Sequence, residues 1–114
     1  MKKTTKKEFD RFVKTCLHWQ QKLQLIEWRL DINHRRIRPD TAAETEYFPE
    51  DRVVSITYNL NPGGGGLRPE HHAKHEMLEV LLCQLDAVAN ARYINPSEVN
   101  EARHAIIRRL EAIL

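Results

Sequence analysis

The chain is poor in glycine and cysteine, and it has no long apolar run. Its four glycines stand together at positions 63–66. No Lys-Ser or Lys-Thr follows them, so they predict a flexible connector and not a phosphate-binding loop. The two cysteines, Cys16 and Cys83, fall within predicted helices, which favours reduced, half-buried thiols over a disulfide. No stretch approaches the roughly 18 apolar residues of a membrane-spanning helix, so we expect a cytoplasmic protein with no membrane partner.

A strong excess of charge of one sign is also lacking. The 114 residues carry 18 Lys and Arg against 16 Asp and Glu, a net charge of +2, which gives no reason to expect a polyanion-binding protein. Basic residues concentrate in the Met1–Lys7 segment and in the turn at 35–38. Short basic tails are usually solvated ends, so nucleic-acid binding is the last of our functional hypotheses. The length predicts a single domain over 1–114, with 1–5 as a flexible basic tail.

Hydrophobic periodicity predicts three helices and three strands. Apolar residues at three- and four-residue spacing predict helices at 6–23, at 70–92, and from a Ser97 cap to 113. Alternation predicts strands at 26–33, 42–48 and 53–60, joined by short turns into an antiparallel meander. Trp19 and Trp28 are the predicted core anchors. The order α-β-β-β-α-α indicates an α+β fold in which helices cover one face of a small, mainly antiparallel sheet.

The helix at 70–92 carries a candidate metal site. His75 and Glu79 lie one turn apart, at the edge of the apolar stripe predicted for this helix. A His and a carboxylate at this spacing can share one metal ion. Glu76 would then lie near the ion without binding it, in the position of a base that activates water. The spacing is that of the zinc metallopeptidase helix H-E-x-x-H, with Glu79 in place of the second His. The predicted stripe comprises Met77, Leu78, Leu81, Leu82, Leu85, Val88 and Ala89.

A catalytic zinc site needs a third protein ligand and an open position for water. The last helix offers His104 and Glu101, with Glu98 as a weaker candidate. His104 lies away from the predicted apolar stripe of that helix, which would turn it toward water. The plain alternative is that His75 and Glu79 form a surface ion pair at i and i+4. A ridge of His71, His75 and Glu79 could also bind metal adventitiously.

Three parts of the chain carry a resemblance to a known family. They are the Trp19–Trp28 stretch with the strand that follows it, the strand at 53–60, and the pair formed by Lys74–Leu82 and Glu101–Glu111. With these features the chain resembles the small minigluzincin-type, SprT-like metallopeptidase proteins that are common in phage and prophage genomes. The resemblance covers most of the chain, but only the helix motif is specific, and that motif departs from the family pattern at Glu79.

The resemblance implies a metal-dependent peptidase with zinc as cofactor. It implies that His75 is a ligand, that Glu76 is the general base, and that a third ligand comes from the last helix. Glu79 in the place of the second His would add negative charge and make the ion a weaker Lewis acid. The strand Val53–Leu60 would be the edge strand that pairs with an extended peptide substrate, with Ile56 and Tyr58 as substrate-binding residues.

A second hypothesis is a non-catalytic, phage-derived protein-binding module that keeps this fold. It would hold a protein partner on an exposed strand edge or on the turn at 35–38, and His75 and Glu79 would be a structural pair. The two hypotheses differ in ligand geometry, because only the peptidase needs a third donor close to His75 and Glu79.

Overall fold

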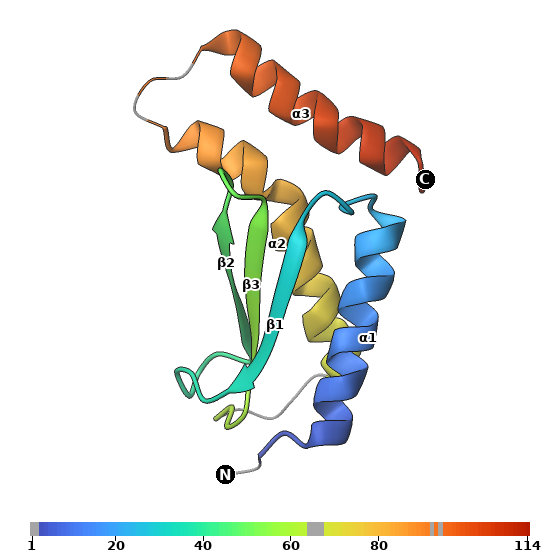
Figure 1. Cartoon of the computed structure of the whole chain (residues 1–114), viewed down its shortest axis with the longest axis vertical. Helices are drawn as coiled ribbons and strands as arrows, with labels where there is room; N and C mark the ends of the chain where they lie inside the picture. Colours follow the sequence, from blue (N-terminus) through green and yellow to red (C-terminus); the bar gives the residue numbers. More distant parts are fainter. Residues whose placement is uncertain (1–2, 64–67, 92, 94) are drawn as a thin grey trace.

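A computed structural model describes residues 3–63, 68–91, 93 and 95–114. Within them the chain forms α1 (Lys6–Lys22), β1 (Arg29–Arg35), β2 (Ala43–Phe48), β3 (Val53–Asn59), α2 (Pro69–Ala89) and α3 (Pro96–Glu111), in that order (Figure 1). The predicted α+β class is therefore confirmed. The predicted flexible connector at 63–66 lies outside the described residues except for Gly63.

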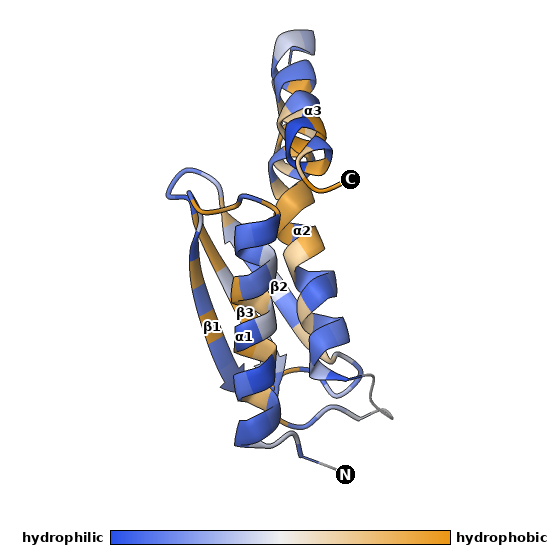
Figure 2. Cartoon of the chain, turned by 90° about the vertical axis from the view of Figure 1, so that its right-hand side faces the viewer, coloured by the Kyte–Doolittle hydropathy of each residue, from blue (hydrophilic) through white to orange (hydrophobic). Residues whose placement is uncertain are grey.

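The elements form two layers and a projecting helix. α1 and α2 lie side by side against one face of the three-stranded sheet (Figures 1 and 2). The other face is not covered by any described element. α3 packs on α2 beyond the end of the sheet and returns toward the end of α1. None of the described helices is long and apolar enough to cross a membrane.

The strand order is β1-β3-β2, so the predicted meander is wrong. β3 pairs in parallel with β1, from Arg29↔Val53 to Arg35↔Asn59, and antiparallel with β2. The physical reason is burial: β3 is the strand richest in β-branched and aromatic residues, whereas charged side chains alternate along much of β1 and β2. The strand that the sequence predicts as an edge is therefore the centre of the sheet, and β2 is an edge.

This topology requires the chain to cross over the end of β3 between β1 and β2, and the buried Asn59 holds the crossing. Its Oδ1 accepts from the backbone N–H of Ile37 at 3.2 Å and of Asn61 at 3.0 Å. Its Nδ2 donates to the carbonyl oxygens of Arg38 at 2.9 Å and Thr41 at 2.6 Å. One side chain thus satisfies three backbone groups of a loop that has no ladder of its own, and a fourth in the segment that follows β3.

The core lies between the sheet and the two helices, and the buried face of α2 overlaps the predicted stripe only in part, at Met77 and Leu81. Ala73, Met77 and Val80 are buried, whereas Leu78 and Leu82 are 38% and 48% exposed. Trp28 belongs to the core, and Trp19 packs at its rim. Both cysteines are free thiols, and they are fully buried instead of half-buried as predicted. The other buried apolar residues are Phe12, Leu23, Leu25, Val54, Ile56, Tyr58 and Ala102.

Capping residues fix the starts of α1 and α3. Thr5 and Glu8 form a capping box, as the sequence allows. Asn95, not the predicted Ser97, caps α3, and its side chain accepts from the Glu98 N–H at 2.9 Å. Thr4 donates through its backbone N–H to the Leu60 carbonyl at 2.9 Å. The predicted flexible tail is therefore tied to the end of β3 from Thr4 onward.

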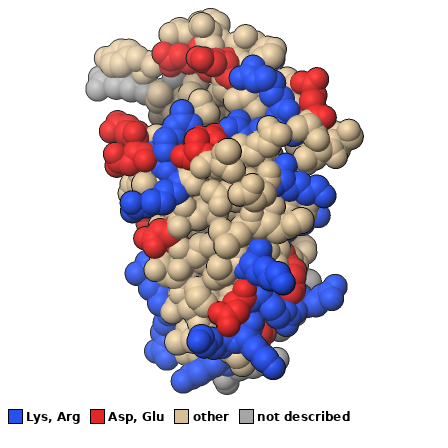
Figure 3. Space-filling view, turned by 45° about the vertical axis from the view of Figure 1, so that its right-hand side comes forward, with Lys and Arg blue, Asp and Glu red and all other residues tan. Residues whose placement is uncertain are grey.

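The described part of the basic N-terminal segment, residues 3–7, and the basic β1–β2 connection lie toward the same end of the molecule (Figure 1). On the face shown in Figure 3, Lys and Arg side chains crowd this lower end. Acidic residues occur in and beside the same segments, at Glu8, Asp10 and Asp40, so the sequence there is of mixed charge.

We expect Asn59→Ala to destabilise the fold by about 3 kcal/mol, because it removes four hydrogen bonds made by a fully buried side chain. Urea denaturation measures this change. Asn33→Ala is the matched control: its side chain makes only long hydrogen bonds of 3.4 and 3.5 Å, and we expect a loss below about 1 kcal/mol. Equal losses in the two variants would contradict the role of Asn59.

Candidate functional site

The predicted ligand pair lies on the outer surface of α2. His75 Nε2 and Glu79 Oε1 are 3.6 Å apart, and their side chains are 64% and 58% exposed. The i and i+4 spacing thus brings the two groups together as the sequence predicts. Ion pairs this exposed contribute only about 0.3–0.5 kcal/mol to a helix. The pair is a surface feature and not the floor of a cleft.

Glu76 points the other way, toward β2. Its side chain is buried and its Oε1 accepts from the Thr45 hydroxyl at 2.7 Å. Burial raises the pKa of Glu76, the hydrogen bond from Thr45 and the nearby His75 oppose the rise, and the charges of Glu79 and Glu44 add to it. A buried carboxyl with a raised pKa next to a strand edge is the most chemically distinctive group of this region.

The candidates for a third ligand lie on α3, which packs beyond the sheet (Figure 1). His104 is exposed, as predicted, and its Nδ1 is 2.8 Å from the Asn100 carbonyl oxygen. Glu101 is also exposed, and Glu98 interacts with the Asn95 side chain at 3.0 Å. In the part of the chain that is described, no three His, Cys, Asp or Glu side chains form a metal-binding group. His75 and Glu79 alone do not make the three-ligand site that zinc catalysis needs.

The predicted substrate-binding residues are in the core. Ile56 is 0% exposed and Tyr58 is 3% exposed, both on the central strand β3. The Tyr58 ring stacks on Phe12, with ring centroids 4.5 Å apart, and its centroid lies 5.7 Å from that of the His34 ring. Because both edges of β3 are already paired, it has no backbone groups to offer a peptide. The assignment of Ile56 and Tyr58 to substrate binding is therefore wrong.

The edge beside α2 belongs to β2, none of whose residues is among the predicted site residues. Thr45 binds Glu76, and the Tyr47 hydroxyl donates to Asp86 near the end of α2. This hydrogen bond is the main cause that raises the pKa of Tyr47 to about 12, and the nearby charges of Asp86 and Glu79 add to it. In the sequence, the alternation of Ala43, Thr45 and Tyr47 with the charged Glu44 and Glu46 is the pattern that indicates a strand with one face toward the helices.

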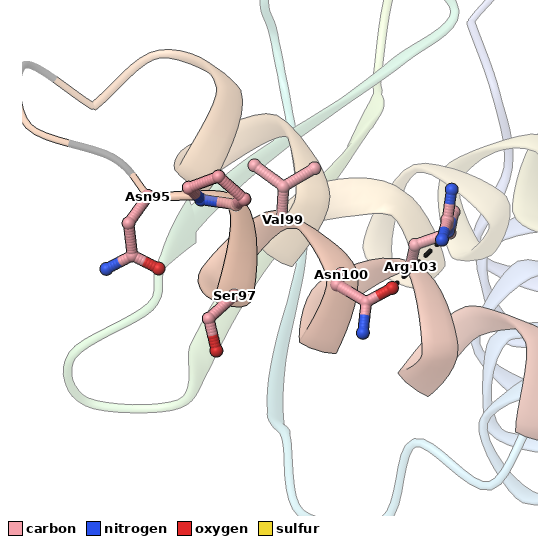
Figure 4. Close-up of a pocket in the computed structure, with 6 residues that line it drawn as sticks. Asn95, Ser97, Val99, Asn100 and Arg103 are labelled. Carbon is pink, nitrogen blue, oxygen red and sulfur yellow. Dashed lines mark hydrogen bonds between the residues drawn. The ribbon is translucent and has the colours of Figure 1, made fainter.

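A hollow of about 730 Å³ lies at the start of α3, apart from all these residues (Figure 4). Its lining is polar at Asn95, Ser97 and Asn100, but these groups are largely engaged locally. Asn95 caps the helix, and Asn100 Oδ1 accepts from Arg103 at 2.9 Å. No predicted catalytic or metal-binding residue lines it.

We expect Glu76→Gln to raise the melting temperature at pH 8 by a few degrees. The folded-state pKa of Glu76 is raised above its usual 4.5, so the folded chain binds this proton more tightly than the unfolded chain. The associated stability is present below the unfolded pKa and is lost as pH rises through the folded pKa. Gln keeps an acceptor for Thr45 and carries no charge.

Thermal unfolding at pH 8 and pH 4.5 tests this, and the gain of Glu76→Gln should shrink at the lower pH. Glu79→Gln is the control, because its side chain is 58% exposed, and it should leave the melting temperature nearly unchanged at both pH values. A lower melting temperature for Glu76→Gln at pH 8 would contradict the account.

Comparisons of the chain with models of protein families, with curated proteins and with solved structures found no match. The resemblance to minigluzincin-type proteins therefore stays a prediction from the sequence motifs. What the chain does has to be argued from the geometry of α2 and β2.

Proposed function

We propose that this chain is a protein-binding module that holds an extended, basic segment of a partner protein along the free edge of β2. The observation that carries the proposal is the position of β2 at the edge of the sheet, beside α2. Addition of a strand to an exposed sheet edge is a general mode of peptide recognition, in which main-chain hydrogen bonds supply affinity.

The pairing of β2 with β3 indicates which backbone groups are available. The Asn59 N–H donates to the Ala42 carbonyl at 2.9 Å, one step before the Ala43↔Tyr58 pair. In an antiparallel pair, hydrogen-bonded positions alternate with positions whose backbone groups point away from the neighbour. Ala43, Thr45 and Tyr47 therefore direct their N–H and C=O groups to the outer edge.

Side chains of β2 fix this edge against α2. The Thr45–Glu76 and Tyr47–Asp86 hydrogen bonds hold the strand at two points along the helix. A fixed strand loses little conformational freedom when a partner pairs with it, which favours binding. This arrangement supports a preformed docking edge.

Carboxylates surround the edge. Glu76 and Asp86 hydrogen-bond to side chains of β2, and Glu44 and Glu46 alternate along β2 itself. The charges of Glu44 and Glu79 reach Glu76, and that of Glu79 also reaches Tyr47. An excess of negative charge favours a partner segment that carries Lys or Arg.

The same charges argue against a second copy of this chain as the partner. Antiparallel pairing of two β2 edges would bring Glu44 and Glu46 of one copy close to those of the other, and like charges opposite each other destabilise a sheet. β1 is also an edge strand, but its exposed residues Arg29, Asp31 and Arg35 are of mixed charge. β2 is thus the edge with a defined charge preference.

We expect a six-residue peptide of alternating Lys and Val, matched to the length of β2, to bind saturably at pH 7. Calorimetric titration measures the affinity. Ala43→Pro removes one outward N–H at the first residue of an edge strand, where proline is tolerated, and should weaken binding about tenfold. Glu44→Lys with Glu46→Lys should abolish binding of this peptide.

Asp31→Lys is the control for charge reversal, because Asp31 lies on β1 at the far side of the sheet. It should leave the affinity nearly unchanged. A matched peptide of alternating Glu and Val should not bind. Equal affinity for the two peptides, or an equal effect of Asp31→Lys and the β2 reversals, would overturn the proposal.

Metal-dependent peptide hydrolysis is our second candidate, favoured by one observation. Glu76, a buried carboxyl with a raised pKa, lies directly beside the strand edge on which a peptide would pair. The candidate also needs a third metal ligand besides His75 and Glu79, which the described arrangement of side chains does not supply.

The metal content of the purified protein tests this candidate. About one zinc per chain, lost in Glu79→Ala, would make Glu79 a ligand and favour hydrolysis. Glu76→Gln would then abolish turnover while the metal is retained. We expect instead no bound zinc in either protein, and no change in melting temperature when zinc is added.

A further inference from the structure

We propose that a groove between α3, the α1–β1 connection and the β2–β3 turn binds the phosphate group of a small phosphorylated molecule. The groove, of about 570 Å³, lies where α3 returns over the end of α1 and the β2–β3 turn. It is distinct from the β2 edge and from the hollow at the start of α3. We call it the arginine groove; it is lined by Gln24, Glu27, Arg52, Gln84, Arg108 and Arg109, with Ala105.

Two of its three arginines are held by other parts of the fold. The Arg109 guanidinium donates to Glu27, to the Gln24 carbonyl at 3.3 Å and to the Ala105 carbonyl at 3.1 Å. The Arg52 guanidinium lies over the Trp28 ring, 5.5 Å from its centroid. These contacts position the charged groups before any ligand binds, which reduces the ordering that binding requires.

Two residues of the groove have left-handed backbone dihedral angles, which residues other than glycine rarely adopt. Gln24 and Arg52 have φ of 55° and 54°, and they are the non-glycine residues with positive φ in the described part of the chain. Gln24 follows the C-cap of α1: the Leu25 N–H donates to the Gln20 carbonyl and the Gln24 N–H to the Gln21 carbonyl. Glycine is the usual residue at this position.

Arg52 ends the turn between β2 and β3, where its N–H donates to the Pro49 carbonyl at 3.3 Å. Glycine or asparagine suits such a position in a hairpin. The chain instead places long polar side chains at both left-handed positions, and both line the same groove. Strained positions that cluster in this way point to a binding role.

The charge of the lining selects the ligand. Three guanidiniums face one carboxylate, Glu27, which leaves an excess of two positive charges. In the described residues neither Arg52 nor Arg108 forms an ion pair. A phosphomonoester carries a charge of about −1.5 to −2 at neutral pH, and guanidinium groups bind its oxygens in pairs. The volume is in the range of roughly 300–1,000 Å³ typical of small-molecule sites.

Titration of the ¹⁵N-labelled protein with inorganic phosphate at constant ionic strength tests the proposal. We expect saturable shifts of the amide signals of Gln24, Arg52, Gln84 and Arg108. Arg108→Gln should weaken binding about tenfold, because it removes a charge-assisted contact. Arg103→Gln, on the same helix but outside this groove, is the matched control and should bind like the wild type.

Arg52→Gly separates binding from folding. Glycine suits the left-handed backbone, so this variant should keep its melting temperature while it loses affinity for phosphate. Non-saturable shifts, acetate binding as strong as phosphate binding, or equal weakening by Arg103→Gln and Arg108→Gln would overturn the proposal.

Discussion

The placement of β3 between β1 and β2 is the constraint on which the rest of this structure depends. It buries the most apolar strand on both edges and makes the chain cross from β1 to the far side of the sheet, where the Asn59 amide satisfies the crossing loop. β2 then becomes an edge beside α2. The turn between β2 and β3 places Arg52 at the end of the sheet, in the groove that α3 also lines. Both proposed binding surfaces follow from this one strand order.

The orientation of α2 decides what its motif can do. At about 100° per residue, neighbouring residues of a helix cannot share one face. Packing of Met77 and Val80 into the core turns Glu76 toward β2 and leaves His75 and Glu79 on the outside. The motif is thereby divided between a buried carboxyl and a surface pair. This division is why the geometry supports docking on β2 better than metal chemistry.

The sequence predicts much of the fold because most elements are signalled locally. The spacing of apolar residues predicts all three helices, and the alternation of side chains predicts all three strands. The strand order was not predictable in this way, since it depends on which strand is most deeply buried and on a loop held by a single buried amide, Asn59.

The sequence predicts only the part of the candidate site that depends on local helix geometry. The proximity of His75 and Glu79 follows from helix geometry alone. The direction of Glu76 follows from the buried face of α2, and the apolar Leu78 and Leu82 drew the predicted stripe toward the exposed side. The assignment of Ile56 and Tyr58 to substrate depends on β3 being an edge strand, and β3 is the central strand. The arginine groove joins residues far apart in the sequence, so no local pattern predicts it.

Amide hydrogen exchange on β2 tests the central claim most directly. The account predicts fast exchange at Ala43, Thr45 and Tyr47, whose N–H groups face outward, and slower exchange at Glu44 and Glu46, which pair with β3. Addition of the Lys-Val peptide should protect the first set and leave the second nearly unchanged. Slow exchange at Ala43, Thr45 and Tyr47 without peptide, or no added protection with it, would contradict a free docking edge on β2.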